Sequence, residues 1–482
     1  MVREEAENTR EDMVIDGVEN GHKPNYEIPD GFNSNYLKTY YVNFFPYAEM
    51  HKWMSYGNDG KHPGCDASYF GRREFSFTLE NDIYLRFQSF KDVDDLEKAI
   101  KHQCPFKIDI GPVYSVDPKK RSAYGQSDGN VFRPVERELV FDIDISDYDD
   151  VRFCCKGADV CSACWPLMTV AIKIIDTALR EDFGFNHILW VYSGRRGVHC
   201  WVCDGKARRL DDGQRAAIVN YLHVHKGNEH SIKKVTLVGQ MFHPFIGRSA
   251  EVVKEFFEEK FVLSQNLFSD EDRYEKILEM IPDESITSEL RGKWQDKKRT
   301  RDDINVVRWG QLKYLLQSGK QKMLGVRRCV EEIMFTFTYP RLDLEVFHIP
   351  IFSFILVSKH MNHLLKAPFC IHPKTGLFNM PPFSIHAVQD THTHGRVCVP
   401  IDPKHCEDFD PSSVPTLSRL LEELNMRPLG SGGEINLENT SLGESYRYFK
   451  SSFLHPLLKS CKEDIENAYA AKVQQSSNSL SW

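Results

Sequence analysis

The sequence predicts a mixed α/β (α+β) fold in which a strand-rich core is interrupted by a helical subdomain. Period-two alternation marks strands at 74–79, 83–87 and 139–145, and short apolar runs mark strands at 188–192 and 198–202. Between 211 and 332 the pattern becomes helical and charged, and strand signals return at 334–346. We therefore expect the chain to leave the core and to re-enter it later.

The elements follow in order along the chain. An aromatic-rich helix is expected near 35–54, and the turn 80–82 joins the first two strands into a hairpin. A helix over 166–182 has apolar residues at helical spacing and ends at Gly184. We expect core segments at 35–210 and 333–425, a helical subdomain at 211–332, and a helical C-terminal region at 426–482 that is frayed from 474 onwards.

Composition and charge exclude several classes of protein. The net charge of -8 argues against a protein coated with nucleic acid, because phosphate contacts require Lys and Arg. Met1–Asn20 carries seven acidic and two basic residues, and residues 1–34 are expected to form a disordered acidic tail. The chain has no run of eighteen apolar residues and no apolar leader, so no membrane span or secretion is predicted. The thirteen cysteines are then expected to be reduced thiols or metal ligands.

Two carboxylates are placed side by side on the strand at 139–145. Asp142 and Asp144 lie at i and i+2, so they point to one face while the apolar residues between them point to the other. Paired oxygen ligands of this kind suit Mg²⁺ or Mn²⁺. Asp343, in the alternating segment Arg341–Glu345, would complete a three-carboxylate site for two metal ions. A solvated strand face has the same spacing, so both interpretations stay open.

A basic loop joins the strands at 188–192 and 198–202. Two glycines allow a tight turn with close approach of backbone amides, and Arg195 and Arg196 present forked donors to phosphate oxygens. The loop is predicted to cradle a triphosphate; the alternative is a basic hairpin loop in water. Its residues are Ser193, Gly194, Arg195, Arg196, Gly197, Val198 and His199.

Four cysteines form the pattern CC-x5-C-x2-C, at Cys154, Cys155, Cys161 and Cys164. Four thiolates at this spacing fit a tetrahedral structural Zn²⁺ site with no position open for a substrate. The alternative is four thiols without metal. Cys200 and Cys203 also form C-x-x-C, but they lie in strand-like sequence and are interpreted as packing residues.

Taken in order, these motifs resemble the eukaryotic DNA primase small (catalytic) subunit, in the archaeal–eukaryotic primase superfamily. The resemblance covers roughly residues 35–420. It is carried by REFSFTL at 73–79, ELVFDID at 138–144, the cysteine motif, the segment 181–204, HPFI at 243–246, YPRLD at 339–343, NHLLKAPFCIHPKTG at 362–376 and VPID at 399–402.

The resemblance implies a role for each matching residue. Asp142, Asp144 and Asp343 would hold two catalytic Mg²⁺ or Mn²⁺ ions, and the four cysteines would hold structural Zn²⁺. The loop 193–199 would bind the triphosphate of the incoming nucleotide. Further nucleotide-binding residues would be Glu74, Tyr84, Arg86, His363, Leu364, Leu365, Lys366 and His372.

The resemblance also implies the biological setting. The fold would be a mixed-sheet primase catalytic core with a structural zinc motif and an inserted small helical subdomain. The enzyme would make short RNA primers from ribonucleoside triphosphates on a single-stranded DNA template, in the nucleus. Its partners would be a large iron–sulfur primase subunit and the catalytic and accessory subunits of DNA polymerase alpha.

Two stretches depart from the family pattern, at about 347–357 and 377–394. Family sequence resumes cleanly after each, so our hypothesis is that both are intron sequence carried into the gene model. If they are present in the protein, an inactive scaffold subunit becomes a competing interpretation. A damage-tolerance primase-polymerase that uses deoxynucleotides is the second alternative.

Overall fold

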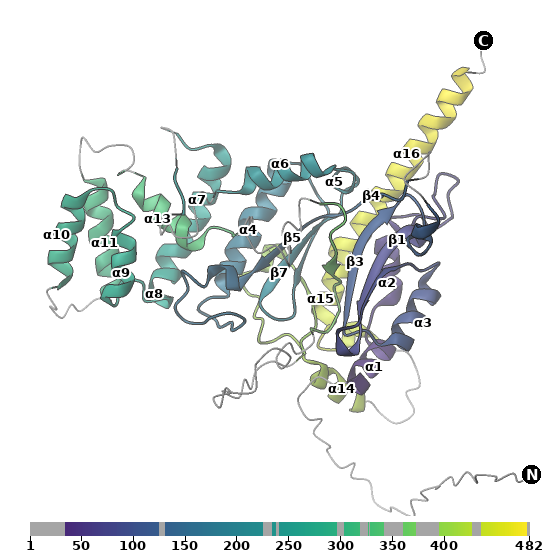
Figure 1. Cartoon of the computed structure of the whole chain (residues 1–482), viewed down its shortest axis with the longest axis horizontal. Helices are drawn as coiled ribbons and strands as arrows, with labels where there is room; N and C mark the ends of the chain where they lie inside the picture. The colour runs from purple at the N-terminus through teal and green to yellow at the C-terminus, as the bar shows by residue number, and fades with distance from the viewer. Residues whose placement is uncertain are drawn as a thin grey trace, which may run out of the picture.

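The computed structural model describes residues 34–124, 131–224, 234–237, 241–295, 303–318, 326, 328–341, 360–372, 395–426 and 435–479. Two antiparallel sheets lie side by side with helices against them, and a helical subdomain extends from one end (Figure 1). The predicted mixed α/β fold is confirmed. In the part of the chain so described, no helix is long and apolar enough to cross a membrane.

The first sheet has the strand order β2-β1-β3-β4. A fifth strand, β8, also pairs with β3 and stands outside this linear order. The pairing of β8 with β3 brings Lys366 opposite Asp109, although the two residues are far apart in the sequence. The hairpin predicted from alternation is confirmed as β1 and β2. The strands are β1 (Arg73–Thr78), β2 (Tyr84–Gln88), β3 (Lys107–Tyr114), β4 (Pro134–Glu136) and β8 (Leu365–Lys366).

The second sheet has the strand order β5-β7-β6-β9. Its register places Asp142 opposite His199 and Asp144 opposite Gly197. The carboxylate strand therefore lies directly beside the end of the basic loop. The strands are β5 (Leu139–Asp144), β6 (Ile188–Tyr192), β7 (Gly197–Val202) and β9 (Pro400–Ile401).

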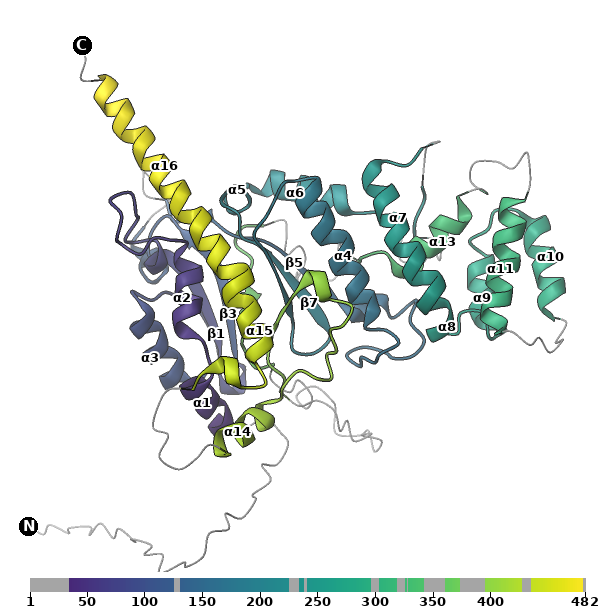
Figure 2. The ribbon, with the colours of Figure 1, turned by 180° about the vertical axis from the view of Figure 1, so that it is seen from behind.

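The helices fall into three groups along the chain. Those beside the sheets are α1 (Ser34–Asn43), α2 (Tyr47–Ser55), α3 (Val93–Gln103), α4 (Pro166–Glu181), α5 (Gly205–Arg208) and α6 (Asp212–Leu222). Those of the helical subdomain are α7 (Pro244–Phe256), α8 (Val262–Ser264), α9 (Glu271–Leu278), α10 (Glu284–Gln295), α11 (Ile304–Gln317) and α13 (Cys329–Thr338). The C-terminal group is α14 (Leu417–Asn425), α15 (Gly443–Arg447) and α16 (His455–Ser479), whose far end projects beyond the body (Figure 2).

Three local expectations need correction. The single helix expected over 35–54 is wrong, because the chain breaks before Pro46 and resumes as α2. Residues 334–338 lie in α13 rather than in a strand, since packing inside the helical subdomain overrides their β-branched and aromatic composition. Residues 474–479, which were expected to be frayed, lie within α16. Of residues 1–34, for which an acidic tail was expected, 1–33 lie outside the described part and Ser34 begins α1.

An aromatic cluster joins the C-terminal segment to α2 and to the second sheet. The ring of Trp53 on α2 lies edge-on to Trp201 of β7 at 5.4 Å, and to Phe449 and Phe453 at 5.9 and 5.7 Å. Phe449 also contacts Phe369 at 5.3 Å. Because aromatic rings bury large areas, this cluster fixes α2, β7 and the π-helical segment Tyr448–Leu454 before α16 together.

A buried ion network crosses between the two sheets. The carboxylate of Glu138 accepts hydrogen bonds from Arg73 of β1 at 3.0 Å and from Arg137 at 2.6 Å. The Tyr56 hydroxyl donates to its other oxygen at 2.6 Å. Both guanidinium groups and the carboxylate are fully buried. Burial disfavours the charge, but the two arginines outweigh it and hold the pKa of Glu138 well below its ordinary value.

Glu138→Ala should destabilise the protein by about 3–5 kcal/mol, because it leaves two buried guanidinium groups without their carboxylate. Tyr56→Phe removes a single hydrogen bond to that carboxylate and should cost about 1.5–3 kcal/mol. Urea unfolding followed by circular dichroism would compare the two. Equal losses, or no loss for Glu138→Ala, would contradict the central place given to this network.

Candidate active site

Asp142 and Asp144 point from β5 toward the loop that follows β6. Arg196 Nε lies 2.5 Å from Asp144 Oδ2, and His199 Nε2 lies 3.6 Å from Asp142 Oδ1. Ser146 donates its backbone N–H and its hydroxyl to Asp144 Oδ1, both at 2.9 Å. The predicted carboxylate pair and basic loop therefore form one site.

The two carboxylates remain accessible while their apolar neighbours do not. The side chains of Asp142 and Asp144 are 42% and 27% exposed, whereas Phe141 and Ile143 are buried. Surrounding protein atoms raise the pKa of Asp142, and Lys366, Lys107 and Arg196 oppose that shift. Accessible carboxylate oxygens of this kind fit divalent metal ions such as Mg²⁺ or Mn²⁺.

The glycines of the loop are required by close packing. A Cβ at Gly197 would overlap the carbonyl oxygen of Ile143 on the neighbouring strand. Gly194 has φ +85°, and a Cβ there would lie 2.9 Å from the Cβ of His372. The Ser193 hydroxyl accepts the Gly197 N–H at 3.0 Å, which closes the turn. The loop is thus held tightly against β5 and the segment that contains His372.

Lys366 reaches the same site from β8. Its Nζ donates to the carbonyl oxygen of Ser193 at 2.9 Å. His199 is buried beside this amine, and burial together with Lys366 and Lys107 lowers the pKa of His199 to about 3. Arg196, Lys366 and a neutral His199 therefore present hydrogen-bond donors around the carboxylates, which is an arrangement suited to phosphate oxygens.

Sequence reasoning missed Lys107 and Asp109 on β3. Lys107 Nζ lies 3.0 Å from Asp109 Oδ1, and Asp109 is 2% exposed. The polar residues Lys107 and Asp109 alternate with Ile108 and Ile110, which is the same period-two signal that identified Asp142 and Asp144. That signal would have predicted the strand and its polar face, but not its pairing with Lys366.

The carboxylate of Glu74 accepts hydrogen bonds from other groups of the protein. Its fully buried carboxylate accepts Arg86 Nε at 3.0 Å, the Phe87 N–H at 3.1 Å and the Tyr114 hydroxyl at 3.0 Å. Tyr84 is 48% exposed on the edge strand β2, where its hydroxyl accepts from Ser76 at 3.1 Å. Glu74 therefore holds Arg86 and its neighbours in place, and Arg86 and Tyr84 are the members of this group accessible to a ligand.

The segment 363–365, which precedes Lys366, packs beside β3. Leu364 packs so closely on Gly111 that an added Cβ would lie 2.6 Å from Leu364 Cδ2, and Leu365 is buried. The carbonyl of His363 accepts Arg137 Nε at 3.1 Å. Burial, with Arg137, Lys107 and Arg86, lowers the pKa of His363 to about 4. Leu364 and Leu365 thus act through packing, while Lys366 is the polar end of the segment.

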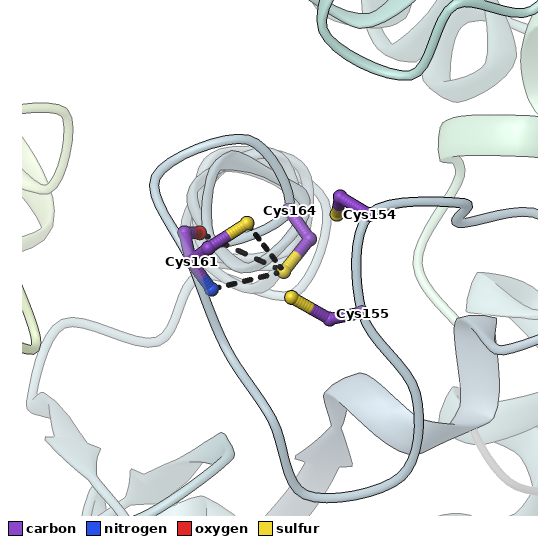
Figure 3. Close-up of side chains that lie close together, drawn as sticks. All are labelled: Cys154, Cys155, Cys161 and Cys164. Carbon is purple, nitrogen blue, oxygen red and sulfur yellow. Dashed lines mark hydrogen bonds between the residues drawn. The ribbon is translucent and has the colours of Figure 1, made fainter. Parts of the chain in front are cut away.

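The four predicted cysteines gather in one cluster before α4 (Figure 3). Their sulfur atoms all lie within 4.8 Å of one another, and those of Cys161 and Cys164 are 3.9 Å apart. Gln265 Nε2 donates to the sulfur of Cys154 at 3.3 Å, and Arg152 Nη1 donates to that of Cys164 at 3.7 Å. A tetrahedral Zn–thiolate site requires sulfur atoms about 3.8 Å apart, so the cluster fits such an ion.

Some predicted features cannot be placed. Asp343 and the stretches 347–357 and 377–394 lie outside the described residues. The nearest described residue, Arg341, is anchored next to the end of β5, where its N–H donates to the Tyr148 hydroxyl at 3.0 Å and its guanidinium pairs with Asp150 at 2.7 Å. Cys200 and Cys203 are fully buried, in agreement with their interpretation as packing residues.

Gly197→Ala should weaken binding of a nucleoside triphosphate by more than about tenfold, because the new methyl group must push the loop away from β5. Calorimetric titration with ATP and Mg²⁺ would measure this. Gly247→Ala on α7 is the matched control, since nothing lies within 4 Å of its added Cβ. Unchanged affinity in Gly197→Ala would show that the loop does not bind the triphosphate in this position.

Comparison with known proteins identifies the family of this chain. The profile of the DNA primase small subunit matches residues 141–385. Proteins named DNA primase small subunit are 35% identical in Schizosaccharomyces pombe, over 91% of this chain and 87% of the relative, and 38% identical in Drosophila melanogaster, over 81% of each. The Saccharomyces cerevisiae protein is 34% identical over 82% of this chain and 87% of its own length.

Among solved structures, the polymerase domain of Mycobacterium tuberculosis ligase D in complex with DNA aligns over 82% of this chain and 92% of its own. The TM-score is 0.28 at 10% identity, a value too low to establish a common fold. The family rests instead on the sequence profile and on the relatives that match most of the chain. By these matches, the chain belongs to the DNA primase small subunit family.

Proposed function

We propose that this protein is the catalytic subunit of a DNA primase that synthesises short RNA primers from ribonucleoside triphosphates on single-stranded DNA. The observation that carries the proposal is the juxtaposition of Asp142 and Asp144 with the donors Arg196 and Lys366. Carboxylates that can hold divalent cations beside groups that bind phosphate are what nucleotidyl transfer requires.

In the proposed reaction, a nucleotide 3′-hydroxyl attacks the α-phosphate of an incoming nucleoside triphosphate and pyrophosphate leaves. Arg196 and Lys366 would hold the phosphate oxygens, and the amides of the glycine loop would line the same position. Asp142 and Asp144 would hold two Mg²⁺ or Mn²⁺ ions, with Asp343 as the third carboxylate. When bound, such ions activate the attacking hydroxyl and neutralise charge on the leaving group.

The proposal extends to the cysteine cluster, for which we assign structural Zn²⁺. All four ligands come from the protein, so no coordination position is left for a substrate. The hydrogen bonds from Gln265 and Arg152 to the sulfur atoms would stabilise thiolates and orient them. The ion would fix the connection between β5 and α4, and hence the position of the carboxylate strand.

Membership of a small-subunit family implies a primase complex with a large subunit. We further propose that the large subunit carries an iron–sulfur cluster and that the complex works with the catalytic and accessory subunits of DNA polymerase alpha in the nucleus. The resemblance of the motifs to the replicative form supports this setting over a damage-tolerance primase-polymerase.

Asp142→Asn should abolish primer synthesis, because the amide removes one charged ligand of the metal site while keeping the shape of the side chain. The assay would use a polypyrimidine single-stranded template with labelled ATP or GTP and either Mg²⁺ or Mn²⁺, in the presence of the large subunit. Parallel reactions with deoxynucleotides would separate a replicative primase from a primase-polymerase.

The control for this experiment is Asp150→Asn, which changes an exposed acid near the site that pairs with Arg341. Primer synthesis should persist in this variant. A version lacking 347–357 and 377–394 would be tested alongside. Absence of products from both the full and the trimmed chain would favour the inactive scaffold interpretation.

Cys161→Ser should remove bound zinc and lower the thermal stability, because three thiolates hold the ion more weakly than four. Elemental analysis of the purified protein should give one zinc per chain for the wild type and little for the variant. Cys65→Ser, outside the cluster, should keep the full zinc content. Equal zinc content in all three proteins would contradict the assignment.

A further inference from the structure

An aromatic group lies next to the buried carboxylate of Glu74. The rings of Tyr114 and Phe132 stack almost in parallel, with centroids 4.1 Å apart and an interplanar angle of 7°. Phe87 meets Phe132 edge-on at 6.0 Å, in a backbone conformation with φ +59°. The Phe87 N–H and the Tyr114 hydroxyl both donate to Glu74. The group, which we name the aromatic platform (Phe87, Tyr114 and Phe132), is therefore fixed by the carboxylate that also holds Arg86.

A short turn of exposed cations covers the edge of this platform. Lys119, Lys120 and Arg121 are exposed on the 3₁₀ turn Pro118–Ala123, which we name the basic turn. The guanidinium carbon of Arg121 lies 4.1 Å from the ring centroid of Phe87. Arg86 approaches the same ring at 4.7 Å. Two guanidinium groups thus gather on one phenylalanine ring.

The basic turn is ordered by its own contacts. Asp117 Oδ1 accepts the Ser89 hydroxyl at 2.6 Å and the Lys119 N–H at 3.0 Å. Among the described residues, no carboxylate forms an ion pair with the three cations. The turn therefore carries three cations against the one carboxylate of Asp117, which leaves a local excess of positive charge in a chain whose net charge is -8.

Strand β3 connects the proposed nucleotide site to the aromatic platform. Lys107, near the carboxylates, is at the start of this strand, and Tyr114 of the platform is at its end. The strand spans about 23 Å at the usual rise per residue, and its residues after Lys107 are buried. Gly111 brings the strand against Glu74 and Leu364 midway. Lys107 and the basic turn therefore place positive charge near opposite ends of β3.

We propose that the basic turn and the aromatic platform bind single-stranded nucleic acid, the template DNA, as it approaches the nucleotide site. Exposed Lys and Arg bind the phosphate backbone, and aromatic or guanidinium planes stack on bases without sequence preference. This inference rests on the proposed primase function and deepens it by locating the strand. A single-stranded RNA would offer the same chemistry, so the test includes both.

The test uses the full chain with Lys119→Glu, Lys120→Glu and Arg121→Glu combined. Fluorescence anisotropy would measure the affinity for labelled oligothymidine and oligouridine between about 50 and 200 mM salt. We expect affinity for oligothymidine to fall at least about tenfold at low salt, and the slope of log K against log salt to decrease by about 2. The slope reports phosphate contacts, which a purely structural defect would leave unchanged.

The matched control reverses three exposed lysines on the projecting helix α16, as Lys459→Glu, Lys462→Glu and Lys472→Glu. It changes the net charge equally but should keep wild-type affinity and slope. Phe132→Leu tests stacking separately, and it should weaken binding about fivefold or more with an unchanged salt slope. Circular dichroism would confirm that each variant is folded.

Wild-type affinity and slope in the triple variant would overturn the inference, and so would an equal loss in the α16 control. A loss confined to oligouridine would overturn the assignment to the template strand. Binding needs no catalysis, so the two proposals can fail separately. If the wild-type chain makes no primers but the triple variant loses affinity as predicted, the proposed function is refuted and the binding surface is supported. If the wild-type chain makes primers but the triple variant keeps its affinity, the proposed function is supported and the binding surface is refuted.

Discussion

The structure depends on the buried carboxylate of Glu138, which lies between guanidinium groups at the junction of the two sheets. Removing these charges from water is costly, and the cost is offset by direct pairing to Arg73 and Arg137 and by the Tyr56 hydroxyl. Arg137 continues the network to the carbonyl of His363. The interaction that joins the sheets therefore also fixes the segment that delivers Lys366 to the carboxylates of β5.

Glu74 is a second buried carboxylate, and its charge is likewise paired with groups of the protein. It holds Arg86, the Phe87 N–H and the Tyr114 hydroxyl, and it has no exposed surface. The buried acids Glu74 and Glu138 thus hold cations inside the fold, whereas the accessible acids Asp142 and Asp144 face the site itself, where Asp144 pairs with Arg196. This division explains how one chain places carboxylates for two opposite purposes: the depth of each side chain decides which charges it can reach.

The sequence alone was sufficient to predict those features whose signal lies in neighbouring residues. Alternation predicted that Asp142 and Asp144 share a face, and cysteine spacing predicted the cluster before α4. It was insufficient where strands pair over long separations, as β8 does with β3, because no local pattern encodes that Lys366 lies opposite Asp109. Residues 334–338 show a third case, since their strand-like composition yields to helical packing in α13.

An acidic chain can bind a polyanion only if its positive charges act locally. At physiological ionic strength, charges separated by more than about 8 Å are largely screened, so acids elsewhere on the chain do not cancel the field at Lys366, Arg86 or Arg121. What matters is that each of these cations is held in a defined place: Lys366 by the Ser193 carbonyl, Arg86 by Glu74, and Arg121 by its position on Phe87. Local order of this kind lets a protein with net charge -8 contact a nucleic-acid strand at a few fixed points. Because few cations contact phosphates, the strand dissociates more readily than it would from a uniformly basic surface.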